Sequence, residues 1–185
     1  HLEQYNRNGE VYGNLTESRF DPNPHRFEGD ICILSLTDKM GTKTKEFLID
    51  AEDYDRIKDY KWGPSSSYIF NEEVGYLHWF ILKMKKPTDR NIQMDHINLN
   101  KMDYRKRNLR ICTQSQNKGN TPKQAHNTSG YKGVFRSKSG KWRAQIAING
   151  NKLHLGVFPT KEEAAERYNR AAIEHFGEFA RINQI

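Results

Sequence analysis

The sequence predicts an α+β protein, in which short antiparallel strands and a few helices form two small modules. Short apolar segments recur between turn residues in both halves of the chain, which is typical of short strands. In the last third, strand-like periods are separated by Ser139-Gly140 and Asn149-Gly150, and Asn-Gly is the strongest short signal for a hairpin. A longer pattern with alanines at helical spacing follows them. With 185 residues, the chain can bury a core as one compact domain or two small ones.

Changes in composition divide the chain into four parts. Residues 1–29 are polar and rich in Asn, Gly and Pro, which predicts an irregular N-terminal arm or an appendage that packs on the rest. Residues 30–120 form the first predicted module. Residues 121–128 have the composition of a loop and are predicted to be a linker. Residues 129–185 form the second module.

Strand-like and helix-like segments alternate in the first module. One predicted helix begins with acidic residues, which suit the positive end of a helix dipole. The predicted segments in chain order are strands 31–34 and 46–49 around a turn at Lys39-Met40-Gly41, a helix at 50–57, a hairpin of 68–70 and 75–77, and a helix at 78–82.

The second module shows clearer periods. Its predicted strands are 131–136, 141–148 and 152–157. A helix follows, opened by a capping box in which Thr160 caps and Glu163 stands three residues on. Because side chains alternate across a strand, Trp142 is expected to face the alanine side of this helix and Arg143 the opposite side. We therefore predict a three-stranded antiparallel sheet with an apolar face against one helix and a polar face outward.

The charge is distributed unevenly. The formal net charge is +7, and no acidic residue occurs between Asp103 and Glu162, where basic and aromatic residues are interleaved. Such a stretch is typical of a surface that contacts phosphates, and the alternative is a solvated basic surface. We expect double-stranded DNA as the partner, contacted mostly at its phosphates. The residues expected to contact DNA are Arg105, Arg107, Arg110, Lys132, Arg136, Lys138, Lys141, Arg143, Gln145, Lys152 and His154.

Other features exclude several classes. Cys32 and Cys112 are the only cysteines, and no Cys-x-x-Cys occurs, so a thiolate zinc site is not expected. Both cysteines are predicted to be reduced and buried, consistent with a cytosolic protein. No hydrophobic run approaches membrane-spanning length, so no membrane partner is expected.

The residues best suited to chemistry lie between 94 and 117. Asp95 and His96 are adjacent in an extended segment, so their side chains project to opposite sides of a strand. A carboxylate can then hold a metal while the imidazole approaches a substrate from another direction. Taken alone, Asp95 also suits a loop-capping carboxylate, and His96 a satisfied surface or core histidine.

The run Asp95-His96-Ile97-Asn98, with Asn108-Leu109-Arg110 and Gln116-Asn117 after it, resembles the ββα-metal (His-Me finger) motif of HNH endonucleases. The variant is His-Asn-Asn, which is common in homing enzymes of phages and introns. The resemblance implies a nuclease domain in which two strands and a helix surround one divalent ion. It implies that Asp95 and Asn117 are metal ligands and that His96 is the general base. It further implies that Asn108 holds the intervening loop through backbone hydrogen bonds.

These residue types suit phosphodiester hydrolysis. A neutral imidazole can deprotonate water near neutral pH. The oxygens of Asp95 and Asn117 suit a hard cation, so we expect one Mg²⁺ or Mn²⁺ per site and no zinc. The arginines that stand close by, Arg105, Arg107 and Arg110, suit phosphate clamping.

The resemblance is incomplete upstream of the motif. The segment from Tyr76 to His78 resembles the one that commonly precedes it, but the family usually has a basic residue after that histidine, whereas this chain has Trp79. The role of His78 is therefore open, and packing is favoured over chemistry.

Residues 129–183 resemble the plant ethylene-response-factor (APETALA family, AP2/ERF) DNA-binding domain, a three-stranded antiparallel sheet backed by one helix. The matching residues are Gly130-Tyr131-Lys132-Gly133-Val134, Gly140-Lys141-Trp142-Arg143-Ala144, Leu155-Gly156-Val157-Phe158, Glu163-Ala164-Ala165, Tyr168, Ala171-Ala172, Gly177 and Asn183. Such a domain often follows the nuclease in phage-type HNH enzymes. Several base-contacting positions of the family differ here, so the plant recognition sequence is not implied. The positions that differ are Phe135, Ser137, Ser139, Ala147 and His154.

The sequence thus favours a metal-dependent DNA endonuclease of the HNH homing type. The alternative is a catalytically silent, sequence-specific DNA-binding regulator. RNA is disfavoured as the substrate, because the sheet lacks the exposed aromatic pair that stacks unpaired bases. One site per chain would nick one strand, and whether the protein nicks or cuts both strands, as a monomer or dimer on DNA, is open. We expect a cytoplasmic protein of a bacterial or phage-infected cell, associated with the nucleoid through DNA.

Overall fold

The computed structural model describes residues 22–38 and 42–185, which form two compact units. Unit 1 comprises the described residues up to Thr88 together with His96–Arg110, and unit 2 comprises Asp89–Asp95 together with Ile111–Ile185. Both units combine small antiparallel sheets with a few helices, which is the mixed class predicted from the sequence. Residues 1–21 of the predicted arm and the predicted turn at 39–41 lie outside the described residues.

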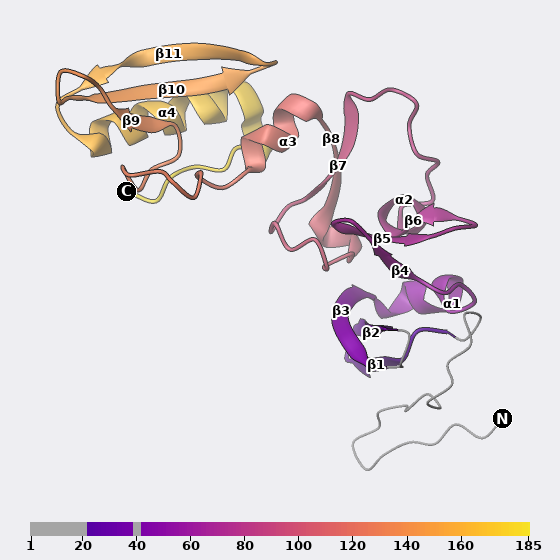
Figure 1. The fold of residues 1–185 in the computed structure, drawn as a ribbon. Coiled ribbons are helices and arrows are strands. Elements are labelled where there is room, and N and C mark those ends of the chain that lie inside the picture. The colour runs from indigo at the N-terminus through magenta and orange to yellow at the C-terminus, as the bar shows by residue number, and fades with distance from the viewer. Residues whose placement is uncertain (1–21, 39–41) are drawn as a thin grey trace. The chain divides into compact units, whose positions relative to one another are not determined.

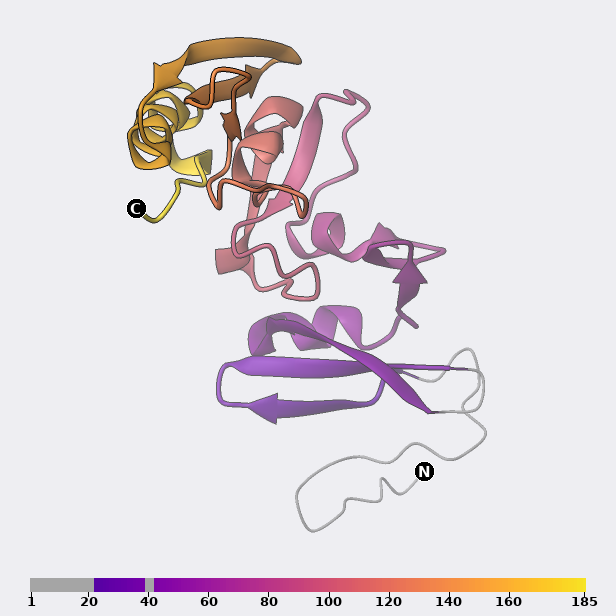
Figure 2. The same ribbon diagram turned by 60° about the vertical axis from the view of Figure 1, so that its left-hand side comes forward.

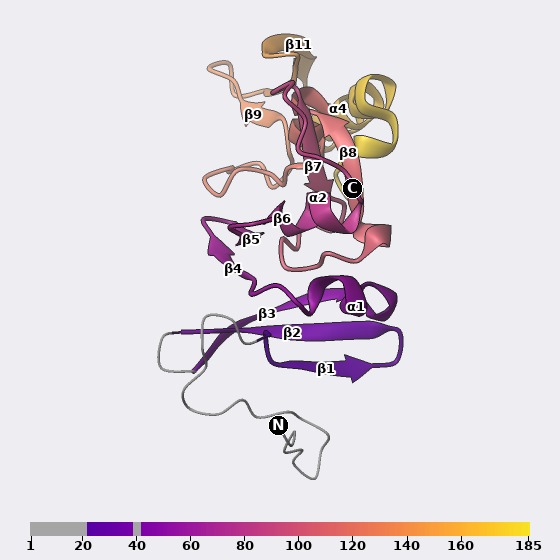
Figure 3. The same ribbon diagram turned by 90° about the vertical axis from the view of Figure 1, so that its right-hand side faces the viewer.

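Unit 1 contains two three-stranded antiparallel sheets, in the orders β1-β2-β3 and β4-β5-β6 (Figures 2 and 3). Most of β2 is buried. The elements in chain order are β1 (His25–Glu28), β2 (Ile31–Thr37), β3 (Lys43–Asp50), η1 (Ala51–Asp53), α1 (Tyr54–Ile57), β4 (Gly63–Ser65), β5 (Tyr68–Asn71), β6 (Gly75–Tyr76), α2 (Leu77–Ile81) and η2 (Lys106–Asn108).

The described end of the predicted arm belongs to the core of unit 1. Strand β1 pairs antiparallel with β2. Before it, Asn23 is buried, and its side-chain amide donates to the carbonyls of Ser35 at 3.1 Å and Trp62 at 2.9 Å. Its amide oxygen accepts from the backbone N–H of Trp62 at 2.8 Å. Residues 22–28 therefore pack on the module, which is the second of the two forms expected for this segment.

A strand pair and a short helix follow one another in the middle of the chain. Strands β7 (Ile92–His96) and β8 (Leu109–Thr113) form a two-stranded sheet, and α3 (Gln114–Asn120) begins directly after β8. The helix opens with a reciprocal capping box. The Thr113 hydroxyl accepts from the backbone N–H of Gln116 at 3.2 Å, and the Gln116 side chain accepts from the backbone N–H of Thr113 at 2.8 Å. This box fixes the angle at which the helix leaves the strand.

In unit 2, an antiparallel sheet in the order β11-β10-β9 has α4 along one face (Figure 1). Its elements are β9 (Val134–Arg136), β10 (Trp142–Ile148), β11 (Asn151–Phe158), α4 (Lys161–Phe176) and η3 (Gly177–Phe179). Ala144 and Ile146 of β10 are buried while Arg143 is exposed, which is the predicted alternation. Small residues of α4 pack on this face, because alanines let the helix approach the sheet closely. The Thr160 hydroxyl caps α4 by accepting from the backbone N–H of Glu163 at 3.2 Å.

Both cysteines are free thiols in buried positions. Burial raises the pKa of Cys32 to about 12. Of the helices in the described part of the chain, none has the length and hydropathy needed to cross a membrane. The domain boundaries at 30–120 and 129–185 stay a prediction from the sequence.

Two glycines with left-handed backbone provide a test of packing in unit 2. At Gly133 (φ +75°) an added Cβ would lie 2.1 Å from Cδ2 of Tyr168, whereas at Gly140 (φ +80°) it would meet open space. Gly140→Ala should lower the free energy of unfolding by about 1–2 kcal/mol, the cost of left-handed backbone. Gly133→Ala should lower it by about 3 kcal/mol or more, because the Tyr168 ring must also move. Urea unfolding followed by circular dichroism measures both, and equal losses would contradict this packing.

Candidate active site and nucleic-acid interface

Asp95 lies near the end of β7 in unit 2, with 4% of its surface exposed. The side-chain Nδ2 of Asn120, the last residue of α3, donates to both carboxylate oxygens at 3.0 Å each. Two residues earlier on the same face of β7, the Gln93 side-chain oxygen accepts from Nδ2 of Asn117 at 2.8 Å. Asn117 and Asn120 are three residues apart and share one face of the helix. Two side-chain pairs therefore connect β7 with α3, and one of them includes Asp95.

Asn120 of α3 thus contacts Asp95, and it is not among the site residues predicted from the sequence. Asn117 lies in the neighbouring pair, and its role as a metal ligand stays a prediction. The signal for Asn120 was present in the sequence, because it follows Asn117 at the spacing that keeps both amides on one helical face.

His96 is held by aromatic rings in unit 1, with 4% of its surface exposed. The Tyr68 ring is stacked on the imidazole at a centroid distance of 6.2 Å, and the Tyr104 ring meets it edge-on at 5.3 Å. The Tyr104 hydroxyl accepts from the backbone N–H of Ile69 at 2.8 Å, which fixes that ring. Asp95 and His96 therefore have separate surroundings, as the alternation along a strand requires.

His78 lies beside the same two tyrosines. Its ring centroid is 5.5 Å from that of Tyr68 and 6.4 Å from that of Tyr104. Its Nδ1 is buried and has no hydrogen-bond partner among the residues that the structure describes. Burial lowers the pKa of His78 to about 4, with smaller contributions from the charges of His96 and Lys86. His78 is therefore neutral at neutral pH and packs within the cluster that surrounds His96.

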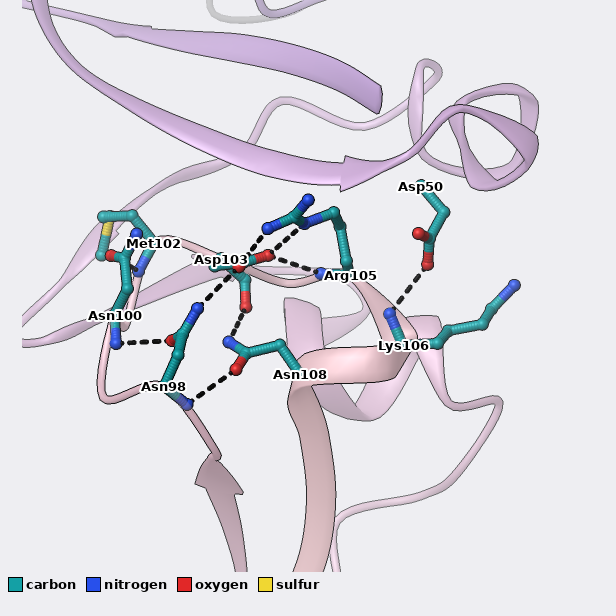
Figure 4. A network of polar contacts seen from close by, with 8 residues as sticks. All are labelled: Asp50, Asn98, Asn100, Met102, Asp103, Arg105, Lys106 and Asn108. Atoms are coloured by element: carbon teal, nitrogen blue, oxygen red, sulfur yellow. Dashed lines mark hydrogen bonds and ion pairs between the residues drawn. The ribbon is translucent and has the colours of Figure 1, made fainter. Parts of the chain in front are cut away.

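The loop between β7 and β8 is closed by Asn108 (Figure 4). Its Oδ1 accepts from the backbone N–H of Asn98 at 2.9 Å, and its Nδ2 donates to the carbonyl of Asp103 at 2.8 Å. The Asn98 side chain in turn donates to the Asp103 carboxylate at 2.9 Å. Asn108 therefore has the contacts that a loop-holding role requires.

Arg105 is engaged within the same loop (Figure 4). Its guanidinium donates to the Asp103 carboxylate twice, from Nε at 2.7 Å and from a terminal nitrogen at 2.6 Å. Burial alone would raise the pKa of Asp103, but hydrogen bonds from Arg105 and Asn98 hold it below its ordinary value. A phosphate would have to compete with this ion pair for Arg105. Of the two other arginines predicted to clamp phosphates, Arg107 is exposed and Arg110 is half-buried.

The outer face of the unit 2 sheet gathers several of the predicted DNA-contacting residues. In the sheet register Gln145 lies opposite His154, and Ala147 lies opposite Lys152, so each pair shares a face. Arg143 lies opposite Phe135 on the same outer side. Those of the set that are exposed at the strands and the β9–β10 turn are Arg136, Lys138, Lys141, Arg143, Lys152 and His154.

Arg136 is exposed but lies on the other face of the sheet. It lies opposite Trp142 in the register, and its guanidinium carbon is 5.7 Å from the centroid of the Trp142 ring. It therefore shares the helix-facing side of the sheet with Trp142, at the margin of the core.

A groove of about 460 Å³ runs between the outer face and the segment from Lys118 to Asn127, all within unit 2. Among the described residues that line it, none is acidic. The basic side chains that line it are Lys118, Lys123, Lys132, Arg143 and Lys152. Lys132 also donates from Nζ to the carbonyl of Gly119 in α3, at 2.6 Å. Such a concentration of positive charge is suited to the phosphates of a nucleic acid.

Comparison with known proteins places the chain in a family. An uncharacterized HNH endonuclease of Acanthamoeba polyphaga mimivirus is 34% identical over 136 residues, covering 70% of each chain. The chain therefore belongs to the HNH endonuclease family, and the resemblance noted in its sequence is confirmed. No family model matches the chain, and no solved structure matches it.

Plant proteins with an AP2/ERF domain match a shorter, C-terminal stretch. The dehydration-responsive element-binding protein 2A of Arabidopsis thaliana is 44% identical over 55 residues, 29% of this chain and 16% of the plant protein. The AP2-like ethylene-responsive transcription factor CRL5 of Oryza sativa subsp. japonica is 52% identical over 50 residues, 25% of this chain and 8% of that protein. These relatives extend far beyond the segment that they share with this chain.

The buried, neutral His78 predicts a dependence of stability on pH. Its pKa in the folded protein is about 4, below the ordinary value of 6.5, so the unfolded chain binds a proton more readily. The contribution of His78 to the free energy of unfolding is therefore fully present above pH 6.5 and is lost as the pH falls towards 4. In the wild type, the free energy of unfolding should fall by about 3 kcal/mol over that range, and His78→Phe should remove this decrease. Urea unfolding at pH 7, 5.5 and 4.5 measures this, with His126→Phe, at an exposed histidine, as the control. Parallel curves for the wild type and His78→Phe would contradict the assignment.

Proposed function

We propose that the protein is a metal-dependent DNA endonuclease of the HNH homing type, which hydrolyses a phosphodiester bond in duplex DNA. One observation supports this most strongly. The consecutive residues Asp95 and His96 have their side chains in separate surroundings: a buried carboxylate lies against an amide of α3, and an imidazole contacts two tyrosine rings. In this proposal β7, β8 and α3 are the two strands and the helix of a ββα-metal motif.

The donor set fits a hard divalent cation. A carboxylate oxygen is a hard ligand that suits such a cation, and the Asp95 carboxylate is held in place by the amide of Asn120. No group of three or more His, Cys, Asp or Glu side chains in the described part of the chain surrounds a common point. An ion here would therefore use Asp95, the amide oxygen of Asn117, and oxygens of phosphate and water, a set suited to Mg²⁺ or Mn²⁺. When bound, the ion neutralises charge on the phosphate and on the leaving oxygen.

The side chains of unit 1 would supply the base. A neutral imidazole at His96 accepts a proton from the water that attacks phosphorus. Tyr68 and Tyr104 restrict the orientation of the ring. Asn108 holds the loop that leaves His96, through its bonds to the backbone of Asn98 and Asp103.

The outer face of the unit 2 sheet would bind the duplex. Its exposed cations contact phosphates, and Gln145 and His154 lie on the same face, where a sheet can enter the major groove. One site per chain would nick one strand, and a double-strand cut would need a dimer, a second engagement of the DNA or a rearrangement. The proposed setting is the cytoplasm of a bacterial or phage-infected cell.

The decisive variant is His96→Ala. DNA ligands are first selected from a random-sequence duplex library with the full chain and then inserted into a supercoiled plasmid. With Mg²⁺, wild-type protein should convert the plasmid to open circles, and EDTA should abolish the conversion. His96→Ala should cut about 10²–10⁴-fold more slowly, the usual contribution of a general base, while its affinity stays within a few-fold.

The matched control is His126→Ala, at an exposed histidine of unit 2, which should cut at the wild-type rate. Normal cutting by His96→Ala would contradict the assignment of the base. Tight, salt-sensitive binding by the wild type without any cutting of the selected DNA would contradict the enzyme and favour a DNA-binding regulator.

A further inference from the structure

Helix α3, which presents Asn117 and Asn120 to β7, is fixed at its far end by the sheet module of unit 2. The ammonium of Lys132 donates to the carbonyl of Gly119 at 2.6 Å and to that of Lys118 at 3.3 Å. The Gly119 carbonyl also accepts from the backbone N–H of Arg181 at 3.2 Å. The last carbonyls of a helix have no partner within it, so these donors complete the helix end.

Packing holds the same helix at two further points. A Cβ added at Gly119 would lie 2.8 Å from Cγ of Phe176, so α3 approaches α4 as closely as a glycine allows. Near the start of α3, the Ser115 hydroxyl accepts from the backbone N–H of Asn149, in the turn between β10 and β11, at 3.0 Å. Both ends of α3 are thus tied to the module that resembles a DNA-binding domain.

We infer that Lys132 is a positioning residue of the proposed active site: by fixing the last turn of α3, it holds Asn120 against the carboxylate of Asp95. The path is short, because Gly119, which accepts from Lys132, immediately precedes Asn120, and Asn120 donates to both oxygens of Asp95. This inference rests on the proposed function, in which Asp95 binds the cation.

The sequence assigned Lys132 to the DNA interface, but its surroundings differ from those of an exposed phosphate contact. Its ammonium is partly buried and faces helix carbonyls, whose partial negative charge favours a cation. Burial, with a smaller contribution from the charge of Arg181, lowers the pKa of Lys132 to about 8. A phosphate would have to displace both hydrogen bonds. Lys152 lines the same groove but is exposed on the outer face, so the two lysines should behave differently.

The test compares Lys132→Met with Lys152→Met in the full chain, because methionine keeps the aliphatic stem and removes the donors. Lys132→Met should bind the selected duplex within twofold of wild type, with an unchanged salt slope. Its single-turnover rate at saturating DNA should fall about tenfold, as for other residues that orient a ligand, and it should need more Mn²⁺ for half-maximal cutting. Lys132→Arg, which keeps donors at that end, should recover most of the rate.

Lys152→Met should show the opposite result in binding, with a salt slope reduced by about one counterion. A reduced slope together with a full rate in Lys132→Met would overturn the inference in favour of a phosphate contact. Wild-type values in every measurement on Lys132→Met would overturn it as well.

Acylation of wild-type lysines, mapped by mass spectrometry, tests the inference without a variant and without cleavage. Added duplex should protect Lys152 several-fold and change the reactivity of Lys132 by less than twofold. Equal protection of the two lysines would overturn the inference. A failure of wild-type protein to cut would instead contradict the proposed function, so the two failures are distinguishable.

Discussion

A carboxylate removed from water must be hydrogen-bonded or paired with a cation, because burying it without either costs several kcal/mol. Asp95 is almost fully buried, and Asn120 supplies two hydrogen bonds to it. The contact requires the last turn of α3 to lie against β7. The capping box at Thr113 fixes the start of the helix, and the contacts of Gly119 with Phe176 and Lys132 fix its end. The contacts that fix both ends of α3 therefore also hold the amide that satisfies this carboxylate.

His96, the residue after Asp95, packs among aromatic side chains. His96 is surrounded by Tyr68 and Tyr104, and the neutral His78 packs against the same rings. The loop that follows His96 is closed by hydrogen bonds of Asn108, and the ion pair of Asp103 with Arg105 lies within that loop (Figure 4). Tyrosine rings thus pack against the proposed base, and an amide of α3 contacts the proposed ligand.

The parts of the fold with a clear local signal could be predicted from the sequence. The strands of unit 2 alternate visibly and are separated by Asn149-Gly150, and Thr160 shows where α4 begins. The adjacency of Asp95 and His96 already implied that their side chains diverge. The spacing of the motif is specific enough to indicate the family from the sequence alone, and the relative confirms it.

The remainder depends on contacts that no local pattern contains. Strand β1 has little apolar alternation and is stabilised by pairing with β2. The partners of Asn120 and Lys132 are distant in the sequence. Asn120 is therefore not among the site residues predicted from the sequence, and Lys132 is predicted there as a phosphate contact. Arg136 faces the helix side because of its register opposite Trp142, which only the sheet defines. Local patterns therefore indicated the residue types of the site, and long-range packing decided their partners.

The most direct test is a titration with Mn²⁺ followed by electron paramagnetic resonance, on the full chain bound to its selected duplex. His96→Ala is used as the background so that the DNA stays intact, and free duplex is subtracted as the blank. The His96→Ala protein should bind one Mn²⁺ per chain, and a second substitution, Asp95→Ala, should abolish that binding without releasing the DNA. Equal Mn²⁺ binding by the single and double variants would contradict a cation site built on Asp95.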